Sequence, residues 1–534
     1  MPQHAADLFF AILKSYGVRQ IFGIPGDELE IFDALAHSGI EFITTRHEQA
    51  AAFMAEAVGK ALSEPAVCIS TLGPGATNLV TGVADAYQNR VPMLVLSGQL
   101  ERKFHKNHPH AHQYINLSRL FAPITKATYT ISSISSMQGT IDKALQIAGE
   151  GIQGPVHITL PIDVMEQEVR GVFIKKKNPQ IKPNTISPSL INNYAELLLN
   201  SSYPVAFLGN KGNNIDISFR NILQKSHIPV MTSFMGKGSF SEKESMSLGT
   251  VSRHLNDQLA QLVKKADLML VVDYDYIEGV QPKMFKNKKI IYINSYSAKE
   301  DALLYPVCEI IGHIDSVTKC LAQEMKHISY STKWNEAEII EVKRKRYQQI
   351  LNSQQMNSVP FNPFRVMQVL QQITTGDEVM VSDVGNHKQV LGLGYDVCKP
   401  HHIHFSNGLS SMGFSLPFAA GLRFTLPNDK TIISINGDGG FLMNVQELET
   451  IRRYNLNIKI IIFVDNAFGM IKSNLLAKYK RVKNLDFTNP DFHYLARSFD
   501  FPYFTVSKKG TIKKIVRKFL NTEGTAILTI PVKY

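Results

Sequence analysis

Short apolar runs alternate along the chain with stretches in which apolar residues recur at helical spacing. Three such runs in the middle of the chain are 204–208, 268–272 and 289–293. Strands of a parallel sheet are buried on both faces and read as continuous apolar runs, whereas the helices that connect them are amphipathic. The pattern therefore predicts an α/β protein built on parallel sheets.

The chain has 534 residues, which is too long for a single hydrophobic core. We predict three parallel-sheet domains, at residues 1–172, 186–345 and 358–534. The outer two echo each other, because Gly154–Pro161 and Gly524–Pro531 are similar short runs stopped by proline. Charged, proline-bearing stretches at 175–183 and 343–363 are expected to join the domains, because such residues bury little apolar surface.

Composition and charge narrow the class of protein. Apolar residues make up 44% and charged residues 19%, as in globular chains, and no apolar run is long enough to span a membrane. The N-terminus reads as an amphipathic helix and not as a signal peptide. The four cysteines lack metal or disulfide spacing, which favours a cytoplasmic location. The net charge of +11 is spread over many segments, so we expect no nucleic-acid partner.

Two aspartates, Asp438 and Asp465, carry the strongest chemical signal. Each follows an apolar run, and a helical stretch separates them, as in a βαβ unit. Because the strands of such a unit are parallel, both carboxylates should emerge at the carboxyl edge of one sheet, where α/β proteins bind ligands. Carboxylate oxygens suit Mg²⁺ or Ca²⁺, and the glycines around Asp438 leave room for a phosphate that completes the shell of the cation.

The run Gly437–Gly440 with the Asp465 loop resembles the signature of enzymes that use thiamine diphosphate (ThDP), in which both segments hold a divalent cation on the diphosphate. Alone, Gly-Asp-Gly after a strand is more often a plain turn. Further matching segments follow the family's order over almost the whole chain, which is identified as a member of the acetolactate synthase and pyruvate oxidase family. The resemblance implies Asp438 and Asp465 as metal ligands, with Asn466 as the alternative to Asp465, and the Ala467 carbonyl as a backbone ligand.

Glu48 opens a predicted helix after the run 41–44. By itself it reads as an acidic residue that complements the positive end of the helix dipole. The resemblance implies instead the glutamate that hydrogen-bonds N1′ of the ThDP aminopyrimidine and so promotes removal of the thiazolium C2 proton. Met412 would prop the cofactor in its V shape. The residues that the resemblance implies as ThDP contacts, each with a simpler reading as turn, cap or core, are Pro25, Gly26, Glu48, Asn78, Gly385, Asn386, His387, Met412, Gly437, Gly439, Gly440 and Met470.

The segments 112–126 and 273–278 resemble the acetolactate synthase branch, particularly its catabolic members. This implies a ThDP- and Mg²⁺-dependent carboligase that decarboxylates pyruvate or a similar 2-oxo acid and joins the acyl carbanion to a second carbonyl. Gln113 would be a polar contact near the reacting carbonyl, with His112 as a weaker candidate. FAD is not expected, because the arginine-flanked Asp-Asp run of FAD-carrying members is missing.

Two other functions stay open. His108, His110 and His112 could serve a simple 2-oxo acid decarboxylase, and a catalytically silent relative could be a binding or regulatory subunit. Family architecture implies a homodimer or homotetramer, with Glu48 of one subunit opposite the metal site of another. Two departures bear on the substrate: Ile471–Asn474 replaces the family's acceptor-side residues, and the sequence ends without the tail that covers the site in many relatives.

Overall fold

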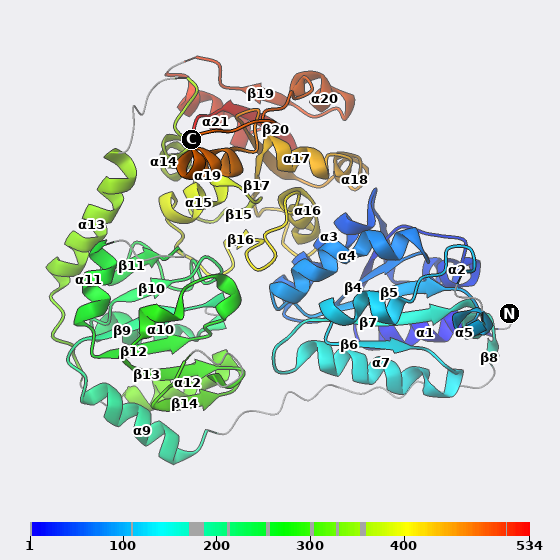
Figure 1. Cartoon of the computed structure of the whole chain (residues 1–534), viewed down its shortest axis with the longest axis horizontal. Coiled ribbons are helices and arrows are strands. Elements are labelled where there is room, and N and C mark those ends of the chain that lie inside the picture. The colour runs from blue at the N-terminus through cyan, green and yellow to red at the C-terminus, as the bar shows by residue number, and fades with distance from the viewer. Residues whose placement is uncertain are drawn as a thin grey trace.

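The computed structural model describes residues 3–107, 110–169, 186–210, 214–252, 257–298, 304–326, 330–352, 359–508 and 510–534. Three six-stranded sheets, each with its strands parallel, form three α/β domains, and the third domain lies across the other two (Figure 1). The predicted fold class is therefore confirmed. The domain boundaries at 172, 186, 345 and 358 stay predictions.

The first domain has the strand order β3-β2-β4-β5-β7-β6. Its strands are β2 (Gln20–Gly23), β3 (Glu41–Thr44), β4 (Ala66–Ser70), β5 (Met93–Gln99), β6 (Ala127–Thr130) and β7 (Pro155–Pro161). Its helices are α1 (Ala5–Ser15), α2 (Leu29–His37), α3 (Glu48–Leu62), α4 (Pro74–Gln88), α5 (Arg102–Asn107), α6 (Leu117–Phe121), α7 (Ile134–Gly149) and α8 (Ile162–Met165). A small antiparallel sheet of β1 (Gln3–His4) and β8 (Glu168–Val169) ties the start of the domain to its end.

The central domain has the order β11-β10-β9-β12-β13-β14. Its strands are β9 (Pro204–Leu208), β10 (Val230–Thr232), β11 (Ser247–Thr250), β12 (Leu268–Val272), β13 (Lys289–Asn294) and β14 (Cys308–Ile311). Its helices are α9 (Pro188–Leu199), α10 (Ile217–Lys225), α11 (Asp257–Lys265), α12 (Ile314–Met325) and α13 (Glu336–Asn352). The three apolar runs predicted here are the strands β9, β12 and β13.

The third domain has the order β16-β15-β17-β18-β20-β19. Its strands are β15 (Val379–Ser382), β16 (Ile403–Phe405), β17 (Ile432–Gly437), β18 (Ile458–Val464), β19 (Tyr503–Thr505) and β20 (Ala526–Pro531). Its helices are α14 (Pro363–Ile373), α15 (Asn386–Gly394), α16 (Ser415–Arg423), α17 (Asp438–Met443), α18 (Glu447–Arg453), α19 (Gly469–Tyr479), α20 (Phe492–Ser498) and α21 (Ile512–Leu520). The spatial order repeats that of the first domain, with β7 and β20 in equivalent places, so the predicted internal echo reflects two domains of one topology.

The first and third domains share a hydrophobic core. Helix α3 packs along α16 so closely that a Cβ on Gly421 would lie 2.4 Å from the Met54 carbonyl oxygen. Phe53 meets Phe414 edge to face, with ring centroids 5.5 Å apart. Burial of such large apolar side chains is the main term that stabilises the contact. Helix α3, which begins at Glu48, is thus packed against the third domain of the same chain.

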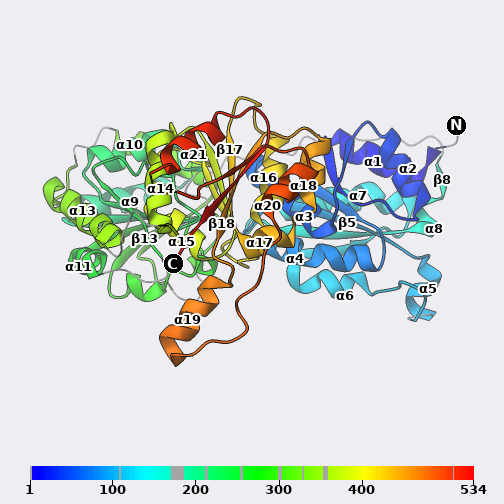
Figure 2. The same cartoon turned by 90° about the horizontal axis from the view of Figure 1, so that it is seen from above.

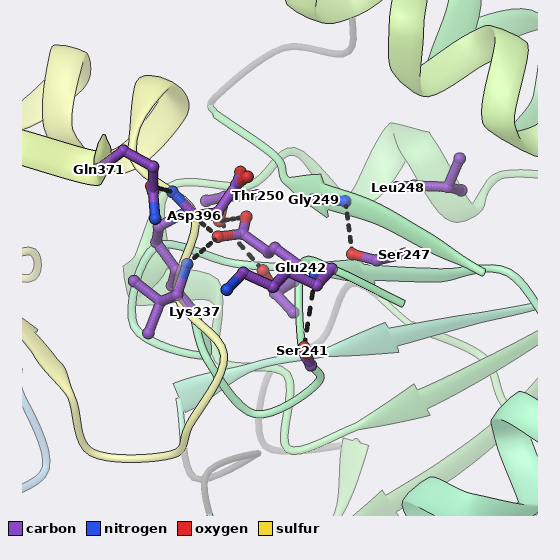
Figure 3. Close-up of polar contacts among 12 residues, drawn as sticks. Lys237, Ser241, Glu242, Ser247, Leu248, Gly249, Thr250, Gln371 and Asp396 are labelled. Carbon is purple, nitrogen blue, oxygen red and sulfur yellow. Dashed lines mark hydrogen bonds and ion pairs between the residues drawn. The ribbon is translucent and has the colours of Figure 1, made fainter. Parts of the chain in front are cut away.

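A buried ion pair within the central domain contacts the third domain through a backbone amide (Figure 3). Lys237 Nζ donates to Glu242 Oε2 at 2.5 Å, and the same oxygen accepts from the Val397 amide at 2.7 Å, just after α15. The basic run 343–346 was expected in a linker, but it lies within helix α13. Lys343 and Arg346 donate to backbone carbonyls of the central domain, so these charges are held in place and not simply solvated.

Candidate active site

The predicted acidic pair sits at the carboxyl edge of the third sheet. Strands β17 and β18 are parallel and pair Gly437 with Phe463, so Asp438 and Asp465 leave neighbouring strands side by side. Asp438 is buried, and its Oδ2 accepts from the Asn466 amide and from Asn489 Nδ2, both at 2.8 Å. Burial and the nearby Asp438 carboxylate raise the pKa of Asp465 to about 6. Two carboxylates in this close arrangement favour a bound cation.

The loop after Asp465 brings further donors to the same place. Asn466 is exposed, with φ of 54°, and its Oδ1 accepts from Asn489 Nδ2 at 2.8 Å. The Ala467 carbonyl accepts from the Gly469 amide at 2.9 Å and keeps a second lone pair for another partner. A Cβ on Gly469 would lie 2.3 Å from Asp465 Oδ2 and 3.4 Å from Asn386 Nδ2, so Asn386 converges on the loop. Met470 follows, half-buried, in α19.

His387 faces the glycine run from the start of α15. Its ring folds back over Gly385, and its Cε1 lies 3.1 Å from where a Cβ on Gly437 would be. Burial lowers the pKa of His387 to about 4, so the ring is neutral at neutral pH. Its Nε2 is buried and has no hydrogen-bond partner in the described part of the chain. Such an atom needs an explanation, and a polar ligand bound at this sheet edge would supply one.

Met412 reaches the same run from a loop of the third domain. A Cβ on Gly439 would lie 3.6 Å from Met412 Cε. Next to it, the fully buried Asp383 accepts from the amides of Gly413 at 3.1 Å and Phe414 at 3.2 Å. Asp383 Oδ2 would be 2.0 Å from a Cβ on Gly440, so no larger residue fits there without movement.

The first domain gathers a second group of predicted residues. Glu48 is 6% exposed at the start of α3, and Asn78 Nδ2 of α4 donates to its Oε2 at 3.0 Å. A Cβ on Gly75 would lie 3.2 Å from Glu48 Oε1, so the glycine keeps the space beside that oxygen clear. The exposed Pro25 and the half-buried Gly26 form the turn after β2, where a Cβ on Gly26 would lie 2.0 Å from the Thr71 hydroxyl oxygen.

Gln113 lies beside this first-domain group through its backbone. Gly73, with φ of 59°, precedes α4, and a Cβ there would lie 2.9 Å from the Gln113 carbonyl oxygen. Gln113 itself has φ of 58°, and both Gln113 and His112 are exposed. His110 is exposed as well, and His108 lies outside the described residues.

Four buried or half-buried polar residues of the site were not predicted. Glu28 accepts from the Thr71 hydroxyl and the Leu72 amide, both at 2.8 Å, and so fixes the turn around Gly26. Glu447 accepts from the Arg46 amide at 3.1 Å and links the third domain to the start of α3. Asp383 directly follows β15 at the same sheet edge as Asp438, so the strand-end rule could have found it. The other unpredicted residue is Asn489.

The arrangement fits a diphosphate held through a cation. In the described ranges, no group of three or more His, Cys, Asp or Glu side chains converges as a metal cluster. Mg²⁺ does not need one, because it usually takes one or two carboxylates and completes its octahedron with phosphate oxygens, carbonyls and water. Asp438, Asp465 and the Ala467 carbonyl supply that kind of oxygen set, and His387 Nε2 is free to contact a phosphate.

Comparison with known proteins agrees with this geometry. Models of the thiamine pyrophosphate enzymes match residues 3–119 (N-terminal TPP binding domain), 191–321 (central domain) and 383–530 (C-terminal TPP binding domain). The chain is 32% identical to the probable acetolactate synthase large subunit of Methanocaldococcus jannaschii, over 98% of this chain and 91% of that protein. It is 29% identical to the catabolic acetolactate synthase of Raoultella terrigena, over 99% and 95%, and to the acetolactate synthase of Bacillus subtilis, over 100% and 94%.

The chain therefore belongs to the ThDP-dependent enzymes of the acetolactate synthase type. The predicted family, the enzyme class and the cofactor ThDP are confirmed, and carboligase activity is the function these relatives support. None of the helices within the described residues is long and apolar enough to cross a membrane.

Proposed function

We propose that this enzyme is a Mg²⁺-dependent carboligase that decarboxylates pyruvate or a similar 2-oxo acid and transfers the acyl unit to a second carbonyl. The observation that carries the proposal is the Asp438–Asp465 pair beside the unpartnered His387 Nε2. Asp438, Asp465 and the Ala467 carbonyl would hold the cation, with Asn466 as the alternative side chain, and Asn386 and His387 would contact the diphosphate. Bound ThDP supplies the electron sink that accepts the electron pair left when CO₂ departs.

The residues of the first domain would handle the proton. Glu48 Oε2 is occupied by Asn78, so its Oε1, beside Gly75, is the atom that would exchange a proton with the aminopyrimidine ring. Because Glu48 is only 6% exposed, few water molecules would compete for this oxygen. Met412, whose methyl group lies near Gly439, would contact the cofactor and support its shape. Gln113, and more weakly His112, would contact the substrate carbonyl. We propose no role for FAD.

Product analysis tests the substrate and the reaction. Labelled pyruvate, Mg²⁺ and ThDP should give CO₂ and acetolactate, and Glu48→Gln should give neither at a comparable rate. Acetaldehyde without any acyloin would favour the decarboxylase. A panel of 2-oxo acids that yields no CO₂ at all would favour the silent relative instead.

We further propose that two copies of the chain complete each site, with Glu48 from one and Asp438 from the other. Helix α19, which follows the metal loop and projects from the body of the chain in Figure 2, has no buried residue and exposes Ile471, Leu476 and Tyr479. Such an exposed apolar face is typical of an interface.

Mixing two inactive variants tests this assembly. If Glu48→Gln and Asp438→Asn chains exchange at random, half of the dimers are mixed and each holds one intact site, so about a quarter of wild-type activity should return. If each site is built by one chain, no activity returns.

A further inference from the structure

The loop from Ser406 to Met412 joins β16 to the segment before α16 and ends at the side chain that reaches Gly439. Its path determines where the Met412 methyl group lies. Ser410 has φ of 58°, a conformation that a non-glycine residue keeps only when its surroundings impose it. The groups that hold this loop therefore bear on the shape of the predicted cofactor site.

Asp85 of α4, in the first domain, holds the loop through a short chain of hydrogen bonds. Asp85 is fully buried, and its Oδ1 accepts from the Ser406 hydroxyl at 2.6 Å. The Ser406 oxygen in turn accepts from the Ser411 amide at 2.9 Å. The chain of bonds thus ends one residue before Met412. A hydrogen bond to a buried carboxylate is shorter and stronger than one between neutral groups.

Asn89, at the end of the same helix, holds the middle of the loop. Its Oδ1 accepts from the Gly408 amide at 3.2 Å, and its Nδ2 donates to Asp85 Oδ2 at 3.0 Å and to Glu56 Oε1 at 2.8 Å. A Cβ on Gly408 would lie 2.8 Å from the Gln88 carbonyl oxygen, so the loop backbone rests against the helix end. Glu56 lies two turns after Glu48 on α3, which ties the Glu48 helix to the same buried cluster.

The third domain holds the two ends of the loop. Lys388, next to His387, donates to the Ser406 carbonyl at 2.7 Å, and Asp383 accepts from the amides that follow Met412. Between these ends, Asp85 and Asn89 supply acceptors from another domain. The first domain therefore contributes to the conformation of a segment that belongs to the third.

From these contacts we propose that Asp85 is a positioning residue for Met412: through Ser406 it sets the path of the loop and couples the packing of the first and third domains to the shape of the cofactor site. The link to catalysis rests on the proposed role of Met412. The link to loop structure does not, because it concerns the protein without cofactor.

Hydrogen exchange followed by mass spectrometry on a peptide covering 406–414 tests the structural part. Asp85→Ala and Ser406→Ala should each speed exchange of this peptide about tenfold or more in the cofactor-free protein. Asp85→Asn keeps an oxygen acceptor for Ser406 but turns an amide towards Asn89 Nδ2, so it should restore slow exchange only in part. Thr318→Val is the matched control, because Thr318 is also fully buried and its hydroxyl donates to the Ile314 carbonyl at 2.6 Å within helix α12 of the central domain.

The functional part is tested with ThDP and Mg²⁺ on the same variants. Ser406→Ala should slow exchange of the ThDP C2 proton and turnover together by about tenfold, leaving KM for pyruvate within about threefold. Thr318→Val should stay near wild type, and Asp85→Asn should lie between the wild type and Ser406→Ala. The proposal is overturned if Ser406→Ala matches Thr318→Val in peptide exchange and C2 exchange. If the loop responds but wild-type enzyme forms no product, the proposed function fails and the structural role of Asp85 stands.

Discussion

Replacing Asp465 by asparagine tests whether the acidic pair is kept for a cation. Without metal, burial and the Asp438 charge raise the pKa of Asp465 from 3.8 to about 6. Near pH 4 and below, the Asp465 carboxyl is largely protonated in the folded protein, so its burial costs little folding free energy. As the pH rises through 6, the Asp465 carboxyl ionises although it is partly buried and repelled by Asp438. At pH 7 the folded protein therefore carries the full free-energy cost of that charge. The difference between the two pKa values corresponds to about 3 kcal/mol of unfolding free energy. Solvent screening of this partly exposed group reduces that cost to about 1 kcal/mol.

Asp465→Asn should therefore stabilise the metal-free third domain at pH 7 by about 1 kcal/mol, raising the unfolding midpoint of that domain by about 2–4 °C. The gain should shrink towards zero near pH 4. With Mg²⁺ and ThDP the order should reverse, because saturating ligand at a hundred times its Kd stabilises the wild type by about 2.7 kcal/mol and the variant by less.

Thermal unfolding at pH 4 and pH 7, with and without both ligands, measures these changes. Asp500→Asn is the control, because the Asp500 side chain is 70% exposed and pairs only at the surface with Arg452. It should change the midpoint little under any condition. The reasoning is refuted if Asp465→Asn destabilises the metal-free enzyme at pH 7, or gains as much from the ligands as the wild type.

Three further substitutions have definite expected results. Glu48→Gln should keep its affinity for ThDP, measured by titration, yet lower the rate of CO₂ release at least about a hundredfold. The reason is that an amide side chain cannot exchange a proton with the aminopyrimidine ring. Unchanged turnover would contradict the role of Glu48. His387→Phe should weaken ThDP binding about tenfold, whereas His157→Phe, at a buried histidine stacked on an aromatic ring in the first domain, should leave it unchanged. Lys237→Met removes the ion-pair partner of the buried Glu242 carboxylate and should cost about 3–5 kcal/mol in urea unfolding. Lys265→Met, at a half-exposed pair, should cost under about 1 kcal/mol. Equal losses would mean that the buried pair contributes no more than a surface pair.

The sequence was enough to place Asp438 and Asp465 on neighbouring strand ends, because that inference uses only local facts. The apolar runs before Asp438 and Asp465 and the helical stretch between them define a βαβ unit, and its parallel strands must bring their carboxyl ends together. The same logic would have found Asp383, which follows the neighbouring strand β15. These predictions depend on chain direction and spacing, which a single sequence displays.

Contacts between segments far apart in the sequence could not be predicted from strand spacing and chain direction. Asp85 and Ser406 are 321 residues apart in the sequence, and Asn489 and Asp438 are 51 residues apart. No local sequence pattern predicts either hydrogen bond. The prediction of a linker at the basic run 343–346 was wrong for a related reason, because it rested on composition alone. Lys343 and Arg346 donate to backbone carbonyls that only the folded central domain brings within reach. Partners of buried polar groups are set by tertiary packing.

Equilibrium binding of ThDP, followed with and without Mg²⁺, tests most directly whether Asp438 and Asp465 hold a cation on the diphosphate. The wild-type enzyme should bind ThDP saturably with Mg²⁺ and lose that affinity when a chelator removes the metal. Asp438→Asn should bind ThDP weakly whether or not Mg²⁺ is present. Equal affinity with and without metal, or wild-type binding by Asp438→Asn, would contradict the account.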